Sequence, residues 1–244
     1  MYIKRLNNTS CSEINLFCFH YAGGSVSAYH SWKDKYPTEV GLFGMQLPAR
    51  GDRFVEDAIV DMEIVISEIV DELKPYLCKP FVFFGHSMGG VVAYGVLRKL
   101  EELGYMAKAI IISASKTPEV YSNATDYLLS DEELKDKLKK LNATPQEILE
   151  NDELMELVLP IYRADLELLS RYNISDDTKL KSKAYIFNSK DDIPKEQIMQ
   201  WSRYFVSEIV YKEFEGGHFF INTSTDKVIF TINDILSTNI SCIR

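Results

Sequence analysis

The fold is decided by the stretch Pro80-Phe81-Val82-Phe83-Phe84-Gly85-His86-Ser87-Met88-Gly89-Gly90. Its apolar first half predicts a buried strand, and the residues from Gly90 to Leu100 predict a helix. Between them lies a Gly-x-Ser-x-Gly turn, and strand, sharp turn and helix together form a nucleophile elbow, which strains the serine backbone and exposes its hydroxyl. A side chain on either motif glycine would collide with the neighbouring strand or helix. The sequence therefore predicts that Ser87 is a nucleophile.

A nucleophilic serine needs a general base, and the position of the histidines selects one. In proteins with such an elbow the chain order is serine, then acid, then histidine. The chain contains four histidines, and only His218 follows the serine. It lies in a glycine-rich stretch directly after the strand-like run 208–214, from which a loop can reach back over the sheet. We therefore predict His218 as the base, the alternative being an ordinary surface histidine.

The acid is expected on a loop between the elbow and His218. Residues 183–188 predict a strand, and Ser189-Lys190-Asp191-Asp192 follow it. Loops of this kind usually run Gly-x-x-Asp, with Ser189 here at the glycine position, so Asp192 is the predicted acid and Asp191 is the alternative. Both aspartates could instead serve only to form the turn, which Asp favours.

Two backbone N–H groups are expected to form the oxyanion hole. One belongs to Met88, the residue after the nucleophile, and the other to the loop after the first predicted strand, 14–19. In that loop, 20–25, Ala22 is the predicted donor, because the two glycines that follow it allow close backbone approach. His20 is expected to pack or to shape the loop.

Composition favours one compact domain spanning residues 1–244. With 244 residues and 46% hydrophobic content, a single α/β domain with a full core is expected. A net charge of −9 argues against nucleic acid as a partner. No apolar run is long enough to span a membrane, and the first residues contain no apolar signal core, so we expect a cytoplasmic protein. The four cysteines lack metal-ligand spacing, and no metal is expected.

Strands and helices alternate along most of the chain. Further strands are expected at 41–46 and 109–112, and helices at 28–35 and 61–77. Short apolar strands separated by helices imply a mostly parallel sheet covered on both faces.

Residues 116–178 interrupt this alternation with helical patterns alone, which predicts a helical lid inserted after the elbow. Ser130 and Glu133 have the spacing of a capping box. Further helices are expected from Thr144, with Pro145 in the first turn, and at 154–159 and 162–169. The leucines of this block could line a channel or pack the lid.

The whole chain resembles the type II thioesterases, members of the α/β-hydrolase superfamily. Four motifs in the same order and spacing carry the resemblance: Phe19-His20-Tyr21-Ala22-Gly23-Gly24, Gln46-Leu47-Pro48-Ala49-Arg50-Gly51-Asp52-Arg53, Phe84-Gly85-His86-Ser87-Met88-Gly89-Gly90 and Leu159-Pro160-Ile161-Tyr162-Arg163-Ala164-Asp165. The chain departs from the family pattern at Ala49, where glycine is usual, and at His20, where proline is usual.

The resemblance implies a hydrolase that removes acyl or aminoacyl groups from the phosphopantetheine arm of carrier proteins. Such monomeric enzymes edit misprimed or stalled nonribosomal peptide synthetases and polyketide synthases in antibiotic biosynthesis. Ser87, Asp192 and His218 would form the triad, without a metal or a cofactor of the enzyme's own, since the phosphopantetheine belongs to the carrier. Arg50 and Arg53 could meet the carrier's phosphate, but pairing with Asp52 or a nearby carboxylate is the favoured interpretation.

Three alternative functions remain open. A releasing or cyclising thioesterase often carries its acid just after the strand that follows the elbow, and residues 108–116 contain no carboxylate there. A general carboxylesterase would use the same triad. A binding protein without activity would not need the complete set of triad residues.

Overall fold

The computed structural model describes residues 1–9, 11–141, 149–174 and 176–241. Within these ranges seven strands form one sheet in the order β1-β3-β2-β4-β5-β6-β7. The strands are β1 (Ile3–Arg5), β2 (Ile14–Phe19), β3 (Val40–Met45), β4 (Phe81–His86), β5 (Ala109–Ser113), β6 (Ala184–Ser189) and β7 (Val210–Phe214). Of the strand pairs in the described residues only β1–β3 is antiparallel, so the expected mostly parallel sheet is confirmed.

The central strands form because most of their residues are apolar on both faces. Every residue of β2, β3, β4, β5 and β6 is buried, as expected for a parallel sheet covered on both sides. The first strand, β1, was not predicted. It has only three residues, two of them basic, and it is held at the sheet edge by pairing with β3.

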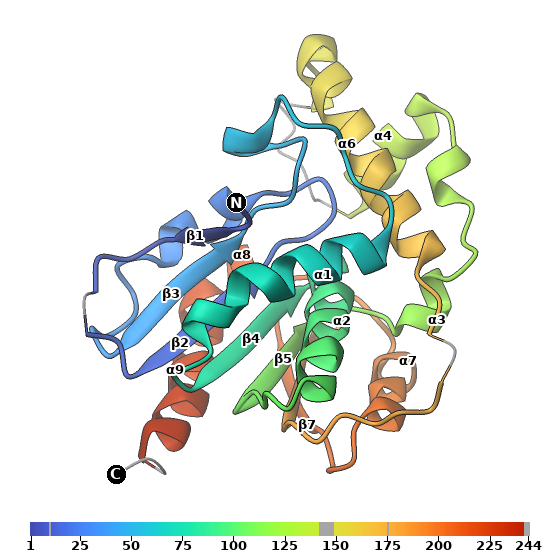
Figure 1. Ribbon diagram of the computed structural model, residues 1–244. Coiled ribbons are helices and arrows are strands. Elements are labelled where there is room, and N and C mark those ends of the chain that lie inside the picture. Colours follow the sequence, from blue (N-terminus) through green and yellow to red (C-terminus); the bar gives the residue numbers. More distant parts are fainter. Residues whose placement is uncertain (10, 142–148, 175, 242–244) are drawn as a thin grey trace.

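Helices lie on both faces of the sheet (Figure 1). The α-helices are α1 (Met62–Leu73), α2 (Met88–Glu102), α3 (Pro118–Tyr121), α4 (Asp131–Lys140), α6 (Asp152–Arg171), α7 (Lys195–Ile198), α8 (Phe220–Thr223) and α9 (Thr225–Ser241). The 3-10 helices are η1 (Val26–Trp32), η2 (Gly51–Arg53), η3 (Lys74–Tyr76), η4 (Asp126–Leu128) and η5 (Met199–Tyr204). Apolar residues of α1 and α2 bury one face of the sheet, and those of α9 and η1 bury the other.

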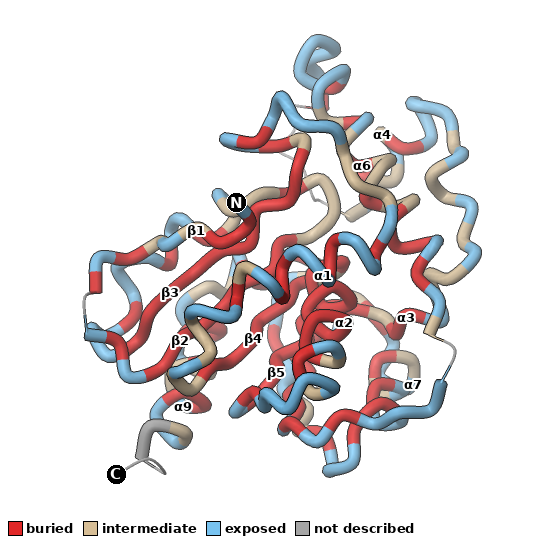
Figure 2. The backbone as a smooth tube through the Cα atoms, in the orientation of Figure 1, coloured by how far each residue is buried: buried red, intermediate tan, exposed pale blue. Residues whose placement is uncertain are grey.

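Among the described residues between β5 and β6, in the segment predicted as a lid, the helices are α3, η4, α4 and α6. Figure 2 shows that exposed and half-buried residues are more frequent in this region than in the sheet and α2. The predicted capping box is present, since Ser130 accepts from the Glu133 N–H while the Glu133 carboxylate accepts from the Ser130 N–H. The helix expected from Thr144 lies outside the described residues.

The expected separate helices at 154–159 and 162–169 are wrong, because both belong to the single helix α6. Pro160 lies inside α6 and removes one backbone donor. The helix continues because packing holds both halves. Leu159 and Tyr162 pack in a small apolar cluster with α4, while Leu168 belongs to the main core. This packing is the reason that proline does not end the helix.

Ala49 occupies a left-handed backbone conformation, with φ of 65°. This conformation destabilises a residue with a side chain by roughly 1–2 kcal/mol. Glycine would remove that strain, but it would raise the conformational entropy of the unfolded chain, which destabilises the folded state by about 0.4–1 kcal/mol. We therefore expect Ala49→Gly to raise the free energy of unfolding by about 0.5–1 kcal/mol in urea titrations. As the control, Ala93→Gly inside α2 is expected to destabilise by about 1 kcal/mol or more. A less stable Ala49→Gly protein would contradict the strain argument.

Candidate active site

Ser87 lies on a strained turn between β4 and α2. Its φ of 53° and ψ of −122° are unusual for a residue with a side chain. The turn is tight enough that a Cβ built on Gly85 would lie 2.1 Å from the carbonyl oxygen of Gly89. A Cβ on Gly89 would lie 2.1 Å from the carbonyl oxygen of Phe19 in β2. The two motif glycines therefore let α2 approach both strands closely.

The structure brings Ser87, His218 and Asp192 into one hydrogen-bonded chain. His218 Nε2 lies 3.1 Å from Ser87 Oγ, and His218 Nδ1 lies 2.8 Å from Asp192 Oδ2. In the tautomer whose Nδ1–H donates a hydrogen bond to the carboxylate, Nε2 carries no proton and can accept the serine proton. The side chains of His218 and Asp192 are 12% and 11% exposed, so water reaches them but does not surround them. Asp191 is exposed and lies outside this chain.

Strand order explains why the acid and the histidine meet. β6 and β7 are neighbours, and Asp192 and His218 follow their carboxyl ends. Ser189, fully buried at the end of β6, ties the two loops together, because its Oγ accepts from the Gly217 N–H at 3.2 Å and from the Asp191 N–H at 3.3 Å. Sequence reasoning noted Ser189 only as a replacement for glycine and missed this bridge.

A second histidine, His86, packs beside the first, with ring centroids 5.4 Å apart. Its Nδ1 lies 2.9 Å from Ser113 Oγ. Complete burial, followed by the charge of His218, lowers the pKa of His86 well below its usual value. A neutral His86 places no permanent positive charge against His218, whose ring can then become positive during a reaction.

The loop after β2 lies next to the elbow because β2 and β4 are neighbours, with Phe19 opposite Gly85. A turn closes this loop where the Gly24 N–H donates to the Tyr21 carbonyl at 3.0 Å. Ala22 and Ser87 line the same cavity. Met88 is the first residue of α2, where backbone N–H groups have no partner within the helix. Both predicted oxyanion donors therefore belong to segments that meet at Ser87.

His20, at the start of this loop, is buried, and its Nδ1 lies 2.8 Å from the Tyr21 carbonyl oxygen. Burial, and next the charge of Arg50, lower its pKa from 6.5 to about 4. His20 therefore binds a proton less readily in the folded state than in the unfolded chain. The free energy of unfolding is not reduced by this group above pH 6.5, and it falls as the pH is lowered from 6.5 towards 4.

We expect His20→Gln to flatten the pH dependence of unfolding in this window. At about 1.4 kcal/mol per pKa unit, the parent should lose roughly 3 kcal/mol through this group between neutral pH and pH 4, and the variant should not. Urea titrations at several pH values measure the difference. His30→Gln, at an exposed histidine, is the matched control and should keep the parent's slope.

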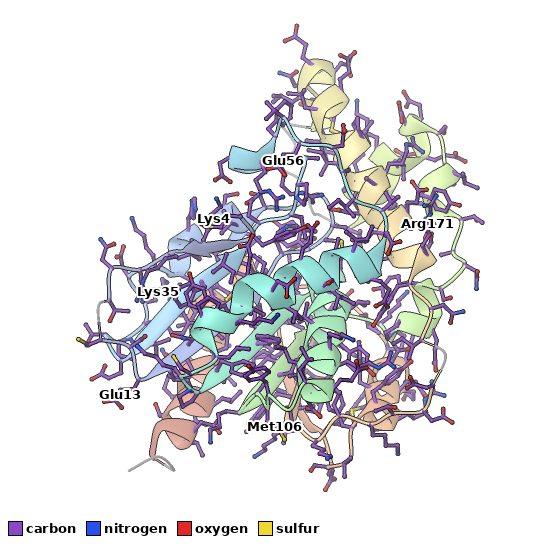
Figure 3. All side chains as sticks on the ribbon, in the orientation of Figure 1. Lys4, Glu13, Lys35, Glu56, Met106 and Arg171 are labelled. Atoms are coloured by element: carbon purple, nitrogen blue, oxygen red, sulfur yellow. The ribbon has the colours of Figure 1, made fainter. Side chains whose placement is uncertain are left out.

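Arg50 and Arg53 both form ion pairs with carboxylates, as the favoured interpretation expected, and in both cases the partner is a carboxylate other than Asp52. Arg50 pairs with Asp165 on α6 at 2.6 Å, and Arg53 pairs with Glu56 at 2.5 Å. Asp52 instead pairs with Lys4 of β1. Glu56 and Lys4 are labelled in Figure 3, on the side of the molecule that carries η2 and β1. The arginines are thus held by the fold rather than free at the surface.

A cavity of 290 Å³ opens beside the triad. Its lining combines the loops after the strands with helices of the segment 116–178, including Val120, Tyr121, Leu166 and Leu169. Other leucines of that segment pack among themselves, namely Leu134, Leu138, Leu149 and Leu159. Both roles considered for the leucines therefore occur. Larger hollows of 490 and 630 Å³ lie elsewhere and contain none of the triad residues.

Two further observations concern metal ions and membranes. Among the described residues, no group of three or more His, Cys, Asp or Glu side chains could hold a metal ion. No helix in the described part of the chain is both long enough and apolar enough to cross a membrane.

A serine on a strained strand-to-helix turn, followed along the chain by an acid and a histidine on a mostly parallel sheet, is the arrangement of an α/β-hydrolase. The thioesterase domain family matches residues 14–236, so the chain belongs to this family. The protein is therefore a hydrolase that acts on thioester bonds, and the predicted fold and family are confirmed.

Individual relatives are similar over nearly their full length. The chain is 30% identical to the linear gramicidin dehydrogenase LgrE of Brevibacillus parabrevis, over 93% of this chain and 89% of LgrE. It is 29% identical to the gramicidin S biosynthesis protein GrsT of Aneurinibacillus migulanus, over 91% and 89%. Among solved structures, the type II thioesterase BorB of the borrelidin biosynthetic cluster superposes with a TM-score of 0.88 at 27% identity, covering 96% of this chain and 97% of BorB.

Proposed function

We propose that the protein is a type II thioesterase that removes acyl or aminoacyl groups from the phosphopantetheine arm of carrier proteins in nonribosomal peptide and polyketide synthesis. The observation that carries the proposal is the hydrogen-bonded chain of Ser87, His218 and Asp192 beside a cavity. The full-length similarity to BorB, a type II thioesterase by its own description, supports the choice of substrate. The role is editing, the clearance of misprimed or stalled intermediates.

The first half of the reaction forms an acyl-enzyme. His218 Nε2 takes the proton of Ser87 as its Oγ attacks the thioester carbonyl, and Asp192 stabilises the imidazolium that results. The tetrahedral oxyanion accepts hydrogen bonds from the N–H groups of Met88 and Ala22, each contributing on the order of 3 kcal/mol. Collapse expels the phosphopantetheine thiol, which leaves with the proton that His218 has held.

The second half releases the acid. His218 removes a proton from water as the water oxygen attacks the Ser87 ester. The same two N–H groups stabilise the second oxyanion, and His218 returns the proton to Ser87 Oγ. Since thiolates are good leaving groups and water supplies the nucleophile, the residues named suffice without a cofactor of the enzyme's own.

The cavity favours a small acyl group. Its volume of 290 Å³ lies just below the usual range for ligand pockets, about 300–1,000 Å³. The helices of segment 116–178 form one wall of this cavity and act as its lid. The lid is part of a single domain that spans residues 1–244. A monomer in the cytoplasm, where the synthetases work, completes the proposal.

The experiment compares hydrolysis of an acetyl- or aminoacyl-phosphopantetheinyl carrier protein with that of a simple acetyl ester, with Ser87→Ala as the control. Rapid release from the carrier, slow turnover of the ester and loss of both in Ser87→Ala are expected. Equal or faster ester turnover would instead identify a general carboxylesterase. A cyclic product would identify a releasing or cyclising thioesterase, and an unchanged biological effect in Ser87→Ala would identify a binding protein.

A further inference from the structure

Two sequence motifs that the triad does not use meet at one buried ion pair. Arg50, in the loop after β3, holds Asp165 of α6 through two hydrogen bonds, of 2.6 Å from Nη1 and 2.7 Å from Nη2. The two side chains are 5% and 3% exposed. A buried pair of this kind is costly to desolvate, and its presence alone is weak evidence of a stabilising role. Its remaining contacts indicate a different role.

Both members of the pair also bind the loop that carries the predicted oxyanion donor Ala22. The Gly23 N–H donates to Asp165 Oδ2 at 2.7 Å, and Arg50 Nη1 donates to the Gly24 carbonyl at 3.3 Å. Arg50 Nε additionally donates to the Pro48 carbonyl at 3.0 Å, which anchors the guanidinium to its own loop. The pair therefore binds one N–H and one C=O of the segment directly after Ala22.

We propose that Arg50 and Asp165 are positioning residues that fix the orientation of the Ala22 N–H for the tetrahedral oxyanion. The inference rests on the proposed acyl transfer at Ser87. Because Asp165 lies on α6, the same contacts fix this cavity-lining helix relative to the oxyanion hole. Arg50 has a second effect, since it neutralises a carboxylate that would otherwise repel the developing negative charge.

The test separates positioning from stability by exchanging the whole pair. In Arg50→Met/Asp165→Leu both charges are removed, and apolar replacement of a buried pair commonly preserves folding. With a short-chain aryl thioester that needs no carrier docking, we expect kcat to fall roughly 100-fold, as for a displaced catalytic group. KM should change little, and a boronic acid, which forms a tetrahedral anion on serine, should bind weaker by a similar factor. Arg53→Met, in the same loop without contact to the Ala22 segment, is the matched control and should keep kcat.

A folded double variant with kcat within about threefold of the parent would overturn the proposal, since this corresponds to less than 1 kcal/mol. If the double variant does not fold, Asp165→Asn and Asp165→Leu decide. The asparagine oxygen can still accept a hydrogen bond from the Gly23 N–H, whereas leucine cannot. The kcat of Asp165→Asn should therefore be about tenfold higher than that of Asp165→Leu. Equal losses in the two would overturn the proposal. Thioester turnover that persists in Ser87→Ala would instead reject the proposed function itself.

Discussion

Asp192→Asn is expected to lower kcat by about 10⁴-fold while the protein stays folded. Asp192 Oδ2 accepts the Nδ1 proton of His218 at 2.8 Å, and this fixes the tautomer in which Nε2 can accept the serine proton. An asparagine can turn its NH₂ group towards Nδ1, which favours the other tautomer. Nε2 would then carry a proton and face Ser87 Oγ as a donor, unable to act as a base.

Asp191→Asn is the matched control, because it removes the same charge from the neighbouring position. Asp191 is exposed, and the hydrogen bond it makes to Ser189 uses its backbone N–H, which the substitution leaves in place. Its kcat should stay within about threefold of the parent, as for an ordinary surface substitution. Steady-state kinetics on an acyl carrier protein, with thermal unfolding as the check on folding, measure both. Equal losses, or a larger loss in Asp191→Asn, would reject Asp192 as the triad acid.

The strands and the helices beside them could be predicted because their signals are local. The runs at 14–19 and 41–46 are mostly apolar segments, and the structure places strands there to within one residue. The failures occurred where tertiary packing overrides local preference. Pro160 predicts a helix end, yet packing on both sides carries α6 through it. The short basic segment β1 becomes a strand only because β3 offers it a partner.

The triad candidates could be ranked because chain order is restrictive, whereas the contacts around them could not. Arg50 and Asp165 are 115 positions apart, and no periodicity links them. The arginine was expected to find a carboxylate, but the nearest in sequence, Asp52, pairs with Lys4. Only the fold, which brings α6 over the loops after β2 and β3, selects the actual partner. The motif containing Asp165 was a signal that this residue matters, without indicating what it contacts.

Gly85→Ala and Gly89→Ala are expected to destabilise the fold by about 4 kcal/mol or more, close to the whole stability of many domains. In each case the new methyl would lie 2.1 Å from a backbone carbonyl oxygen, which no rotamer change can relieve. Gly104→Ala is the control. Its φ of 87° is also unfavourable for alanine, but nothing lies within 4 Å, so only the backbone strain of roughly 1–2 kcal/mol should appear.

The same substitutions link the packing of the elbow to its chemistry. The carbonyls that a Cβ on Gly89 would meet belong to Phe19 and His20, where β2 leads into the loop of Ala22. Any Gly89→Ala protein that folds must therefore move α2 away from that loop, carrying Met88 and Ser87 with it. Since a displacement of about 1 Å can cost 100-fold in rate, the folded fraction should also show reduced kcat. Urea unfolding measures the stability, and kcat normalised to the concentration of reactive Ser87, found by active-site titration, measures the activity of the folded fraction. A variant as stable as the parent and with the parent's kcat would contradict the close packing described for the elbow.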